Sequence, residues 1–376
     1  MSAPLVEPAA DLSSAELARY ARQIVIPGVG LDAQRRLKAA RVLVLGAGGL
    51  GSPALLYLAA AGVGVIGIVD DDVVDASNLH RQVVHGTPSL GSPKTASAAA
   101  RIRELNPHVT VQEHRERLTA GNAIEMFGLY DLVVDGSDNF ATRYLAADAA
   151  EITDRPVVWG SIMRFEGQVS VFWASKGPSY RDLFPEPPVG PDALSCEQAG
   201  VFGVLPGQVG TAMTTEAIKL ITGMGETLLG RLAVLDALAG TWREFRLERD
   251  PDRVPITQLG ASAADDGEPA DADGLSPADL GALLAARACR EADFDLIDVR
   301  EEDEYALDRI EGARLVPLSR IRAGAAEIPR DREVVLICQG GVRSARLLAS
   351  LREDGHAQVR HLAGGLDAWR RAQPRG

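Results

Sequence analysis

Short apolar runs alternate with helix-like stretches through most of the 376-residue chain. Arg41–Leu45, Val65–Val69 and Leu132–Asp135 are runs of four or five residues rich in valine, leucine and isoleucine, which is typical of strands buried on both faces of a parallel sheet. Residues 52–61, between the first two runs, have a helical composition. This order of strand, helix and strand predicts an α/β protein with a Rossmann-like nucleotide-binding domain and a mainly parallel sheet.

A second alternation occupies the end of the chain, where residues 294–297 and Glu333–Ile337 are expected to be strands and residues 345–351 a helix. Residues 261–273 consist only of alanine, aspartate, glycine, glutamate, proline and serine, and such a segment cannot bury enough surface to fold. We therefore expect a domain at residues 1–247, a flexible acidic linker at 248–273 and a smaller α/β domain at 274–376.

A glycine turn, Gly46-Ala47-Gly48-Gly49-Leu50-Gly51, directly follows the first predicted strand. Asp70 ends the second strand, 19 residues after Gly51, where a carboxylate could bind ribose hydroxyls. The G-x-G-x-x-G pattern alone is a weak signal. Its position between two strands, with an acid at this distance, predicts a binding site for an adenine nucleotide.

Charged side chains that could hold a polyphosphate follow the glycine turn. Arg81 and Lys94 could neutralise phosphates, while Asp138, just after a buried strand, could hold Mg²⁺ at the edge of the sheet. These groups favour phosphate chemistry over hydride transfer, although a dehydrogenase and a non-catalytic binding scaffold are alternatives. Binding of ATP and exchange of pyrophosphate would discriminate among the three.

A cysteine lies in a loop between a predicted strand and a predicted helix, in the sequence Cys338-Gln339-Gly340-Gly341-Val342-Arg343. Backbone amides and the positive end of a helix favour thiolate over thiol at such a position. Four residues separate Cys338 from Arg343, whereas phosphatase loops of this kind have five. The smaller loop suits a single terminal sulfur, so we interpret Cys338 as a sulfur carrier whose anion is stabilised by Arg343 and the loop amides.

Composition excludes several classes of partner. A net charge of −13 argues against nucleic acid and against an anionic membrane surface. The first 12 residues lack a signal-peptide pattern, and no apolar stretch reaches the length of about 18 residues that a membrane span requires. The three cysteines, at positions 196, 289 and 338, form no disulfide framework, so we expect a cytoplasmic protein. Cys289, in an apolar helical run, is expected to pack in a core.

The chain resembles two known families. Residues 19 to about 247 resemble the MoeB/ThiF adenylyltransferases, bacterial relatives of ubiquitin-activating enzymes, and the matching segments are residues 19–23, 46–51, 77–82, 135–139, 165–168, 195–197 and 203–207. Residues 274–376 resemble a rhodanese domain through residues 298–300, 311–313, the Cys338 loop and residues 362–365. The fused arrangement is similar to the MoeZ (MoeBR) subgroup.

The resemblance implies a two-step reaction. ATP with Mg²⁺ would adenylate the C-terminal Gly-Gly carboxylate of a small ubiquitin-like sulfur carrier protein, and a persulfide on Cys338 would then convert it to a thiocarboxylate. The sulfur would come from thiosulfate or a protein persulfide. Arg22 would reach the phosphates of the neighbouring subunit in a homodimer. The nucleotide-binding candidates from motif and resemblance together are Gly46, Gly48, Gly49, Gly51, Asp70, Asp72, Ser77, Asn78, Arg81, Gln82, Lys94, Asp138 and Asn139.

The sequence departs from the MoeB/ThiF pattern at a structural zinc site. Ser179, Asp182, Arg253 and Ile256 stand at the positions where that family usually has two Cys-x-x-Cys pairs, so we expect no zinc. Cys196 could be a thiol that releases the thiocarboxylate, an acyl acceptor, or a loop cysteine without a role. The sequence leaves open whether the carrier serves molybdopterin, thiamin, cysteine or tRNA sulfur.

Overall fold

The computed structural model describes residues 3–8, 11–187, 200–260 and 274–373. It contains two compact units, Met1–Asp266 and Gly267–Gly376, and each is described by itself. Both units are α/β with mainly or wholly parallel sheets, which confirms the predicted fold class. Within the described residues, none of the helices has the length and apolar character required to cross a bilayer.

The first unit is built on an eight-stranded sheet of order β3-β2-β1-β4-β5-β6-β7-β8. The first five strands in the chain pair in parallel, and the last three add antiparallel to one edge. The strands are β1 (Arg41–Leu45), β2 (Val65–Val69), β3 (Thr110–His114), β4 (Leu132–Asp135), β5 (Val157–Met163), β6 (Glu166–Phe172), β7 (Arg231–Asp236) and β8 (Thr241–Arg246).

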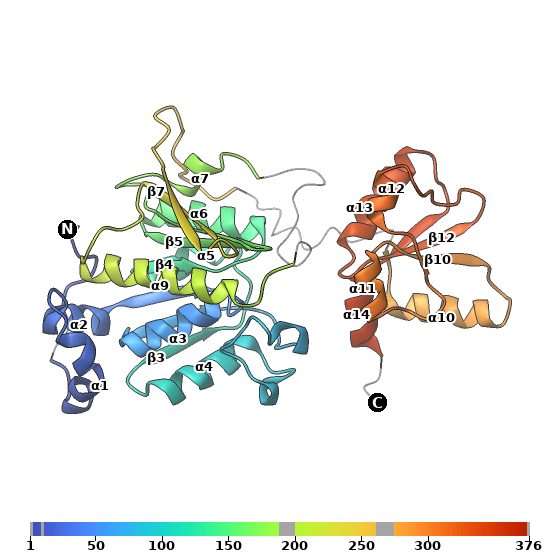
Figure 1. Cartoon of the computed structure of the whole chain (residues 1–376). Helices are drawn as coiled ribbons and strands as arrows, with labels where there is room; N and C mark the ends of the chain where they lie inside the picture. The colour runs from blue at the N-terminus through green and yellow to red at the C-terminus, as the bar shows by residue number, and fades with distance from the viewer. Residues whose placement is uncertain (1–2, 9–10, 188–199, 261–273, 374–376) are drawn as a thin grey trace. The chain divides into compact units, whose positions relative to one another are not determined.

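Helices cover both faces of this sheet (Figure 1). They are α1 (Ser14–Ile24), α2 (Gly30–Ala39), α3 (Gly51–Ala61), α4 (Lys94–Leu105), α5 (Ala123–Gly128), α6 (Phe140–Thr153), α7 (Tyr180–Leu183) and α9 (Leu205–Thr222), with short 3-10 helices η1 (Ala76–Asn78) and η2 (Thr87–Ser89). Alternate residues of β1 point to opposite faces: Val42 and Val44 pack with α3, α4 and α9, whereas Leu43 and Leu45 pack with α5 and α6. The parallel strands β1, β2 and β4 are thus mainly buried, as their continuous apolar runs predict.

The strand order places the predicted nucleotide-binding segments at one edge of the sheet. Neighbours β2 and β4 flank β1, and Leu45 is in register with both Val69 and Asp135. The glycine turn, Asp70 and the segment that carries Asp138 therefore all begin side by side at the carboxyl ends of these strands. In open parallel sheets this point, where the chain order reverses, is where ligands bind.

The second unit has a five-stranded parallel sheet of order β11-β10-β12-β13-β9. Its strands are β9 (Gly274–Leu275), β10 (Phe294–Asp298), β11 (Arg314–Leu315), β12 (Glu333–Ile337) and β13 (Val359–Leu362). Its helices are α10 (Pro277–Ala288), α11 (Glu302–Leu307), α12 (Leu318–Arg322), α13 (Val342–Glu353) and α14 (Gly365–Ala372).

The expectation that Cys289 packs in a core is wrong. Cys289 directly follows α10 as its C-cap residue, and its side chain is exposed. Leu280 is the only fully buried described residue of α10, because the helix lies on the surface of its unit with one narrow face against the sheet. An apolar composition alone could not show which side of the helix a residue at its end would occupy.

Candidate active sites

The glycine turn between β1 and α3 is fixed by close backbone approach. Gly46 has φ of +85°, and a Cβ on Gly51 would lie 1.8 Å from the carbonyl oxygen of Gly46. No side chain could be accommodated at Gly51 without moving the turn. The two glycines therefore let β1 pass directly into α3, whose first amides face the carboxyl edge of the sheet.

Ala47, inside the turn, is held from both sides. Its amide donates to Oδ2 of Asp70 at 2.8 Å, and its carbonyl accepts from Nε2 of His85 at 2.9 Å. Oδ1 of Asp70 accepts from the amide of Asp72 at 2.9 Å. Burial raises the pKa of Asp70, and the charge of Lys94 and these two amides partly oppose that rise. Asp70 thus holds the glycine turn in place. It also lies at the sheet edge where the nucleotide is expected to bind.

His85 is a buried residue of this site that sequence reasoning missed. A carbonyl oxygen can only accept, so Nε2 of His85 carries the proton, and Nδ1 accepts from the Ser97 hydroxyl at 2.9 Å. Burial lowers the pKa of His85, and the charge of Lys94 lowers it further. The uncharged ring therefore links α4 to the glycine turn through these two hydrogen bonds. Its only sequence signal is its place just after the 77–82 segment.

Lys94 begins α4 and lies among three carboxylates. Its Nζ is 2.9 Å from Oδ2 of Asp72, and the residue is 6% exposed. Burial alone would lower the pKa of Lys94, but Asp70, Asp72 and Asp138 together raise it above its ordinary value. The structure thus brings together four of the predicted residues, with Lys94 as a charged group at their centre.

Asp138 lies exposed beyond the carboxyl end of β4. The backbone of its loop is held by hydrogen bonds to two buried side chains. Asp135 accepts from the amide of Ser137 at 3.0 Å, and Arg143 of α6 donates to the Ser137 carbonyl from Nε at 3.2 Å and from a terminal nitrogen at 3.0 Å. Asn139 caps α6, its side-chain oxygen accepting from the amide of Thr142 at 2.8 Å. The loop therefore exposes Asp138, while Ser137 beside it is buried. Arg143 is a second residue that sequence reasoning missed.

The segment 77–82 lies beside the glycine turn. Arg81 donates to the Ser77 carbonyl at 3.0 Å, and its Cγ would be 3.8 Å from a Cβ placed on Gly49. Gln82 is 4% exposed, and its Oε1 has no hydrogen-bond partner among the described residues. Asn78 donates to the Ser77 hydroxyl at 3.3 Å. Of these side chains, Arg81 and Gln82 lie beside the glycines of the turn at which a phosphate would bind.

Two predicted residues stand apart from this group. Arg22 is exposed in the last turn of α1, and no hydrogen bond or ion pair in the described parts of the chain joins it to the other candidates. Cys196 lies outside the described residues.

An ion-pair cluster includes Arg253 and Asp182, two of the four positions at which the family resemblance would place zinc ligands. Arg253 donates from Nε to Asp182 at 2.9 Å and from a terminal nitrogen to Glu151 at 3.0 Å. Asp182 also accepts from the amide of Ser179 at 2.6 Å, and Glu151 accepts from the amide of Ile256 at 3.0 Å. Side-chain exposure is 14% for Arg253, 8% for Glu151 and 0% for Asp182. We call these three side chains the Arg253 clasp.

The carboxylates of the clasp stabilise the charge of its arginine. Burial alone would lower the pKa of Arg253, but the hydrogen bonds and charge of Glu151, with Asp182, raise it. One cation bridges two carboxylates from α6 and α7, and it thereby ties the segment after β8 to these helices.

The second unit carries Cys338 directly after β12, in a loop that closes tightly over the sulfur. Cys338 is 1% exposed. Gly341 has φ of +88°, and a Cβ on it would lie 2.8 Å from the amide nitrogen of Gly364. The carbonyl of Cys338 accepts from the amide of Leu366 at 2.9 Å. The 364–365 turn therefore packs against the cysteine loop. The helix α13 begins at Val342, directly after Gly341.

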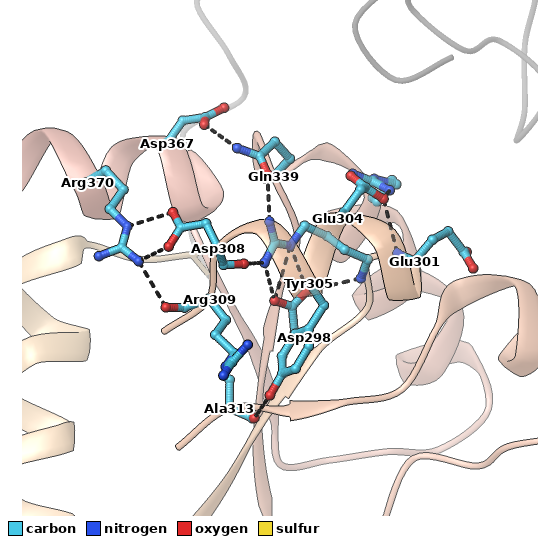
Figure 2. A network of polar contacts seen from close by, with 12 residues as sticks. Asp298, Glu301, Glu304, Tyr305, Asp308, Arg309, Ala313, Gln339, Asp367 and Arg370 are labelled. Carbon is cyan, nitrogen blue, oxygen red and sulfur yellow. Dashed lines mark hydrogen bonds and ion pairs between the residues drawn. The ribbon is translucent and has the colours of Figure 1, made fainter. Parts of the chain in front are cut away.

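A network of polar contacts lies beside this loop and includes Gln339 (Figure 2). Arg300, 1% exposed, is bound to Asp298 and donates to Oε1 of Gln339 at 2.8 Å. Arg343 makes a two-pronged ion pair with Glu304 of α11, at 2.8 and 2.6 Å. The bonds to Glu304 raise the pKa of Arg343; burial alone would raise the pKa of Glu304, but Arg343 lowers it. Sequence reasoning missed Glu304, which is separated from the loop by more than 30 residues.

Comparison with known proteins identifies a different family in each of the two units. Residues 20–255 match the model of the ThiF family, and residues 278–372 match that of the rhodanese-like domain. The chain is 50% identical over 379 residues to a probable adenylyltransferase/sulfurtransferase MoeZ of Mycobacterium tuberculosis, covering 97% of this chain and 96% of that protein. It is 50% identical over 246 residues to a sulfur carrier protein adenylyltransferase of Thermus thermophilus, covering 64% of this chain and 90% of that one.

Solved structures show the same fold at lower identity. The crystal structure of Escherichia coli MccB with ATP has a TM-score of 0.56 and 19% sequence identity, covering 64% of this chain and 74% of that one. This likeness concerns the fold alone.

Proposed function

The chain belongs to the ThiF family and ends in a rhodanese-like domain, and from that premise we propose how its two sites share one reaction. The protein is an enzyme, an adenylyltransferase and sulfurtransferase that uses ATP. It adenylates a sulfur carrier protein and then transfers sulfur to it. The observation that carries the assignment of the first site is the convergence of Asp70, Lys94 and Asp138 beside the glycine turn.

At the first site, the C-terminal Gly-Gly carboxylate of the carrier attacks the α-phosphate of ATP, and pyrophosphate leaves with the bonding electron pair. A free carboxylate is a poor acylating agent, whereas the acyl-adenylate is a good one. Lys94 and Arg81 neutralise the phosphates, the amides of the glycine turn bind their oxygens, and Asp70 binds the ribose. Catalysis is mainly positioning and charge neutralisation.

The donors around Asp138 fit a magnesium ion. Its carboxylate is exposed at the sheet edge, Asp72 lies close to the same lysine, and carboxylate oxygens are preferred ligands of Mg²⁺. Asp138 would hold the ion, which would supply further neutralisation of the phosphate charge. Arg22 completes the site from the other subunit of a homodimer, which accords with its exposed position away from the glycine turn.

At the second site, Cys338 accepts a sulfur atom from thiosulfate or a protein persulfide. The terminal sulfur of the resulting persulfide attacks the acyl-adenylate, so that a carbon–sulfur bond forms and AMP leaves. A thiol then reduces the acyl disulfide and frees the thiocarboxylate, and Cys196 is a candidate for that thiol. The product suits a carrier for molybdopterin, thiamin, cysteine or tRNA sulfur.

Mass spectrometry of Gly-Gly carriers tests this proposal. After incubation with enzyme, ATP and thiosulfate, one carrier is expected to gain the mass of sulfur in exchange for oxygen. Asp138→Ala is the matched control: it should remove several kcal/mol of transition-state stabilisation and abolish carrier-dependent ATP–pyrophosphate exchange. Binding of carriers without any such exchange by the wild type would favour a scaffold instead, and failure to bind ATP would favour a dehydrogenase.

A further inference from the structure

The buried sulfur of Cys338 has a charge problem that its arginines do not solve. A thiolate or persulfide anion needs a compensating cation when it is removed from water. Arg300 is already balanced by Asp298, and Arg343 by Glu304. Because each of these two cations already pairs with a carboxylate, among the described residues they compensate an anion at Cys338 only in part.

Ser344 makes direct contact with the sulfur. It is 0% exposed and lies in the first turn of α13. Its amide donates to Sγ of Cys338 at 3.4 Å, and its hydroxyl oxygen is 3.3 Å from the same sulfur. The hydroxyl also lies 2.9 Å from the carbonyl of Gly341, so its proton has more than one acceptor within reach.

His361 lies on the far side of that hydroxyl. Its Nδ1 is 3.2 Å from Oγ of Ser344, and the residue is 1% exposed on β13. Its register partners in the neighbouring strands, Leu336 and Gly274, carry no charge. Sulfur, hydroxyl and imidazole therefore form a continuous chain of hydrogen-bond distances inside the unit.

We infer that Ser344 is a catalytic residue of sulfur loading and that His361 acts through it as the acceptor of the Cys338 proton. The thiol proton passes to Oγ of Ser344 while the hydroxyl proton passes to Nδ1 of His361. The products are a thiolate, an intact hydroxyl that donates to it, and an imidazolium cation. The charge of the buried sulfur is then matched by a buried cation one hydroxyl away.

Sulfur loading follows from that state. The thiolate attacks the outer sulfur of thiosulfate, the sulfur–sulfur bond of the donor breaks, and sulfite leaves with its electron pair. The negative charge moves to the terminal sulfur on Cys338, and the imidazolium remains as its partner. A protein persulfide would react in the same way and leave as a thiolate.

The test measures loading of sulfur from thiosulfate onto the full-length enzyme, and it rests on the second site of the proposed function. Ser344→Ala is expected to lower the loading rate by about 10²-fold, in the range of general acid–base effects, and Ser344→Thr to restore most of it. His361→Asn keeps an oxygen near the position of Nδ1 but has no basic nitrogen. It should lower both the rate and the thiolate absorbance of Cys338, measured as a difference from Cys338→Ala.

Two controls make the result specific. Ser350→Ala changes an exposed serine of the same helix, and His356→Asn changes a buried histidine whose ring nitrogens face backbone carbonyls of Leu351 and Ile328. Both should leave the thiolate absorbance unchanged. Wild-type rate and absorbance in Ser344→Ala or in His361→Asn would overturn the inference. Failure of the wild type to load sulfur would instead overturn the proposed function of Cys338.

Discussion

Ala47 has no functional side chain, yet the geometry of the nucleotide site depends on it. Asp70 binds its amide and His85 its carbonyl, so the segment after β2 and the loop before η2 both hold this residue. The glycines and Asp70 could be predicted from sequence because backbone approach restricts the residue type and because the spacing along the chain is local. His85 could not, because its role arises from a contact across 38 positions.

Removing the His85 ring should loosen the glycine turn. We expect His85→Ala to weaken ATP binding by about tenfold, which corresponds to one lost buried hydrogen bond. His85→Gln, whose side-chain amide can still donate to Ala47, should bind more nearly like the wild type. Calorimetric titration with ATP measures both, and His108→Ala, at an exposed histidine, is the control. Equal affinity of His85→Ala and wild type would contradict this role.

The buried ring of His85 also predicts that the stability of the protein depends on pH. Burial lowers the pKa of His85 below its ordinary value of 6.5, so the folded protein binds this proton less readily than the unfolded chain does. Its contribution to stability is therefore complete above 6.5 and is lost as the pH falls below that value toward the folded pKa. The melting temperature of wild type should fall more steeply with acidification than that of His85→Gln. Parallel curves would show that the ring does not titrate in this way.

Among the secondary-structure elements, those with strong apolar runs were predictable. Arg41–Leu45, Val65–Val69, Leu132–Asp135 and Glu333–Ile337 are strands with the bounds expected from sequence. Two-residue β9 and β11 are too short to carry a pattern, and β8 is exposed along its whole length. Such strands are specified by pairing with their neighbours rather than by their own composition.

The Arg253 clasp should carry substantial stability in the first unit. Arg253→Ala leaves the buried carboxylates of Glu151 and Asp182 without their cation, which typically costs about 3–5 kcal/mol. A clear drop in the melting temperature of that unit is expected in scanning calorimetry. Arg246→Ala is the control, because Arg246 and Glu248 are 85% and 70% exposed and such a pair contributes less than about 1 kcal/mol. Similar effects of the two substitutions would show that the clasp is not a stabilising element.

At the scale of the whole molecule, two separately packed units carry two distinct kinds of chemistry. Each has its own sheet and its own hydrophobic clusters. The sequence predicted both sites from local motifs, since the glycine turn and the cysteine loop each follow a strand. The residues that it missed, His85, Arg143 and Glu304 among them, make contacts that exist only in the folded chain.

The two reactions should be separable by mutation. Cys338→Ala leaves Arg81, Lys94 and Asp138 untouched, so ATP–pyrophosphate exchange with the carrier is expected to persist. Sulfur loading and thiocarboxylate formation should disappear, because alanine cannot hold sulfur. Sulfide must be excluded, since it could attack the adenylate directly. Thiocarboxylate formation at the wild-type rate by this variant would place the sulfur-carrying residue elsewhere.

Subunit mixing tests the proposed role of Arg22. If Arg22 acts across a homodimer, mixing Arg22→Ala with Asp138→Ala should recover part of the exchange activity, because each mixed dimer contains one site with both residues intact. Mass-labelled subunits confirm that exchange of chains has occurred. A mixture that stays inactive despite mixed dimers would place Arg22 in the site of its own subunit or outside catalysis.

The Arg253 clasp also has a consequence for the need of this protein for zinc. A second consequence concerns which thiol groups could react with the sulfur atom that the protein transfers. A zinc site of the usual kind in this family would require four cysteine sulfurs, each a competing acceptor whenever the metal was lost. Guanidinium and carboxylate groups neither accept sulfur nor respond to chelators. We therefore expect folding of this unit at the clasp to depend on the Arg253 ion pairs rather than on a supply of zinc.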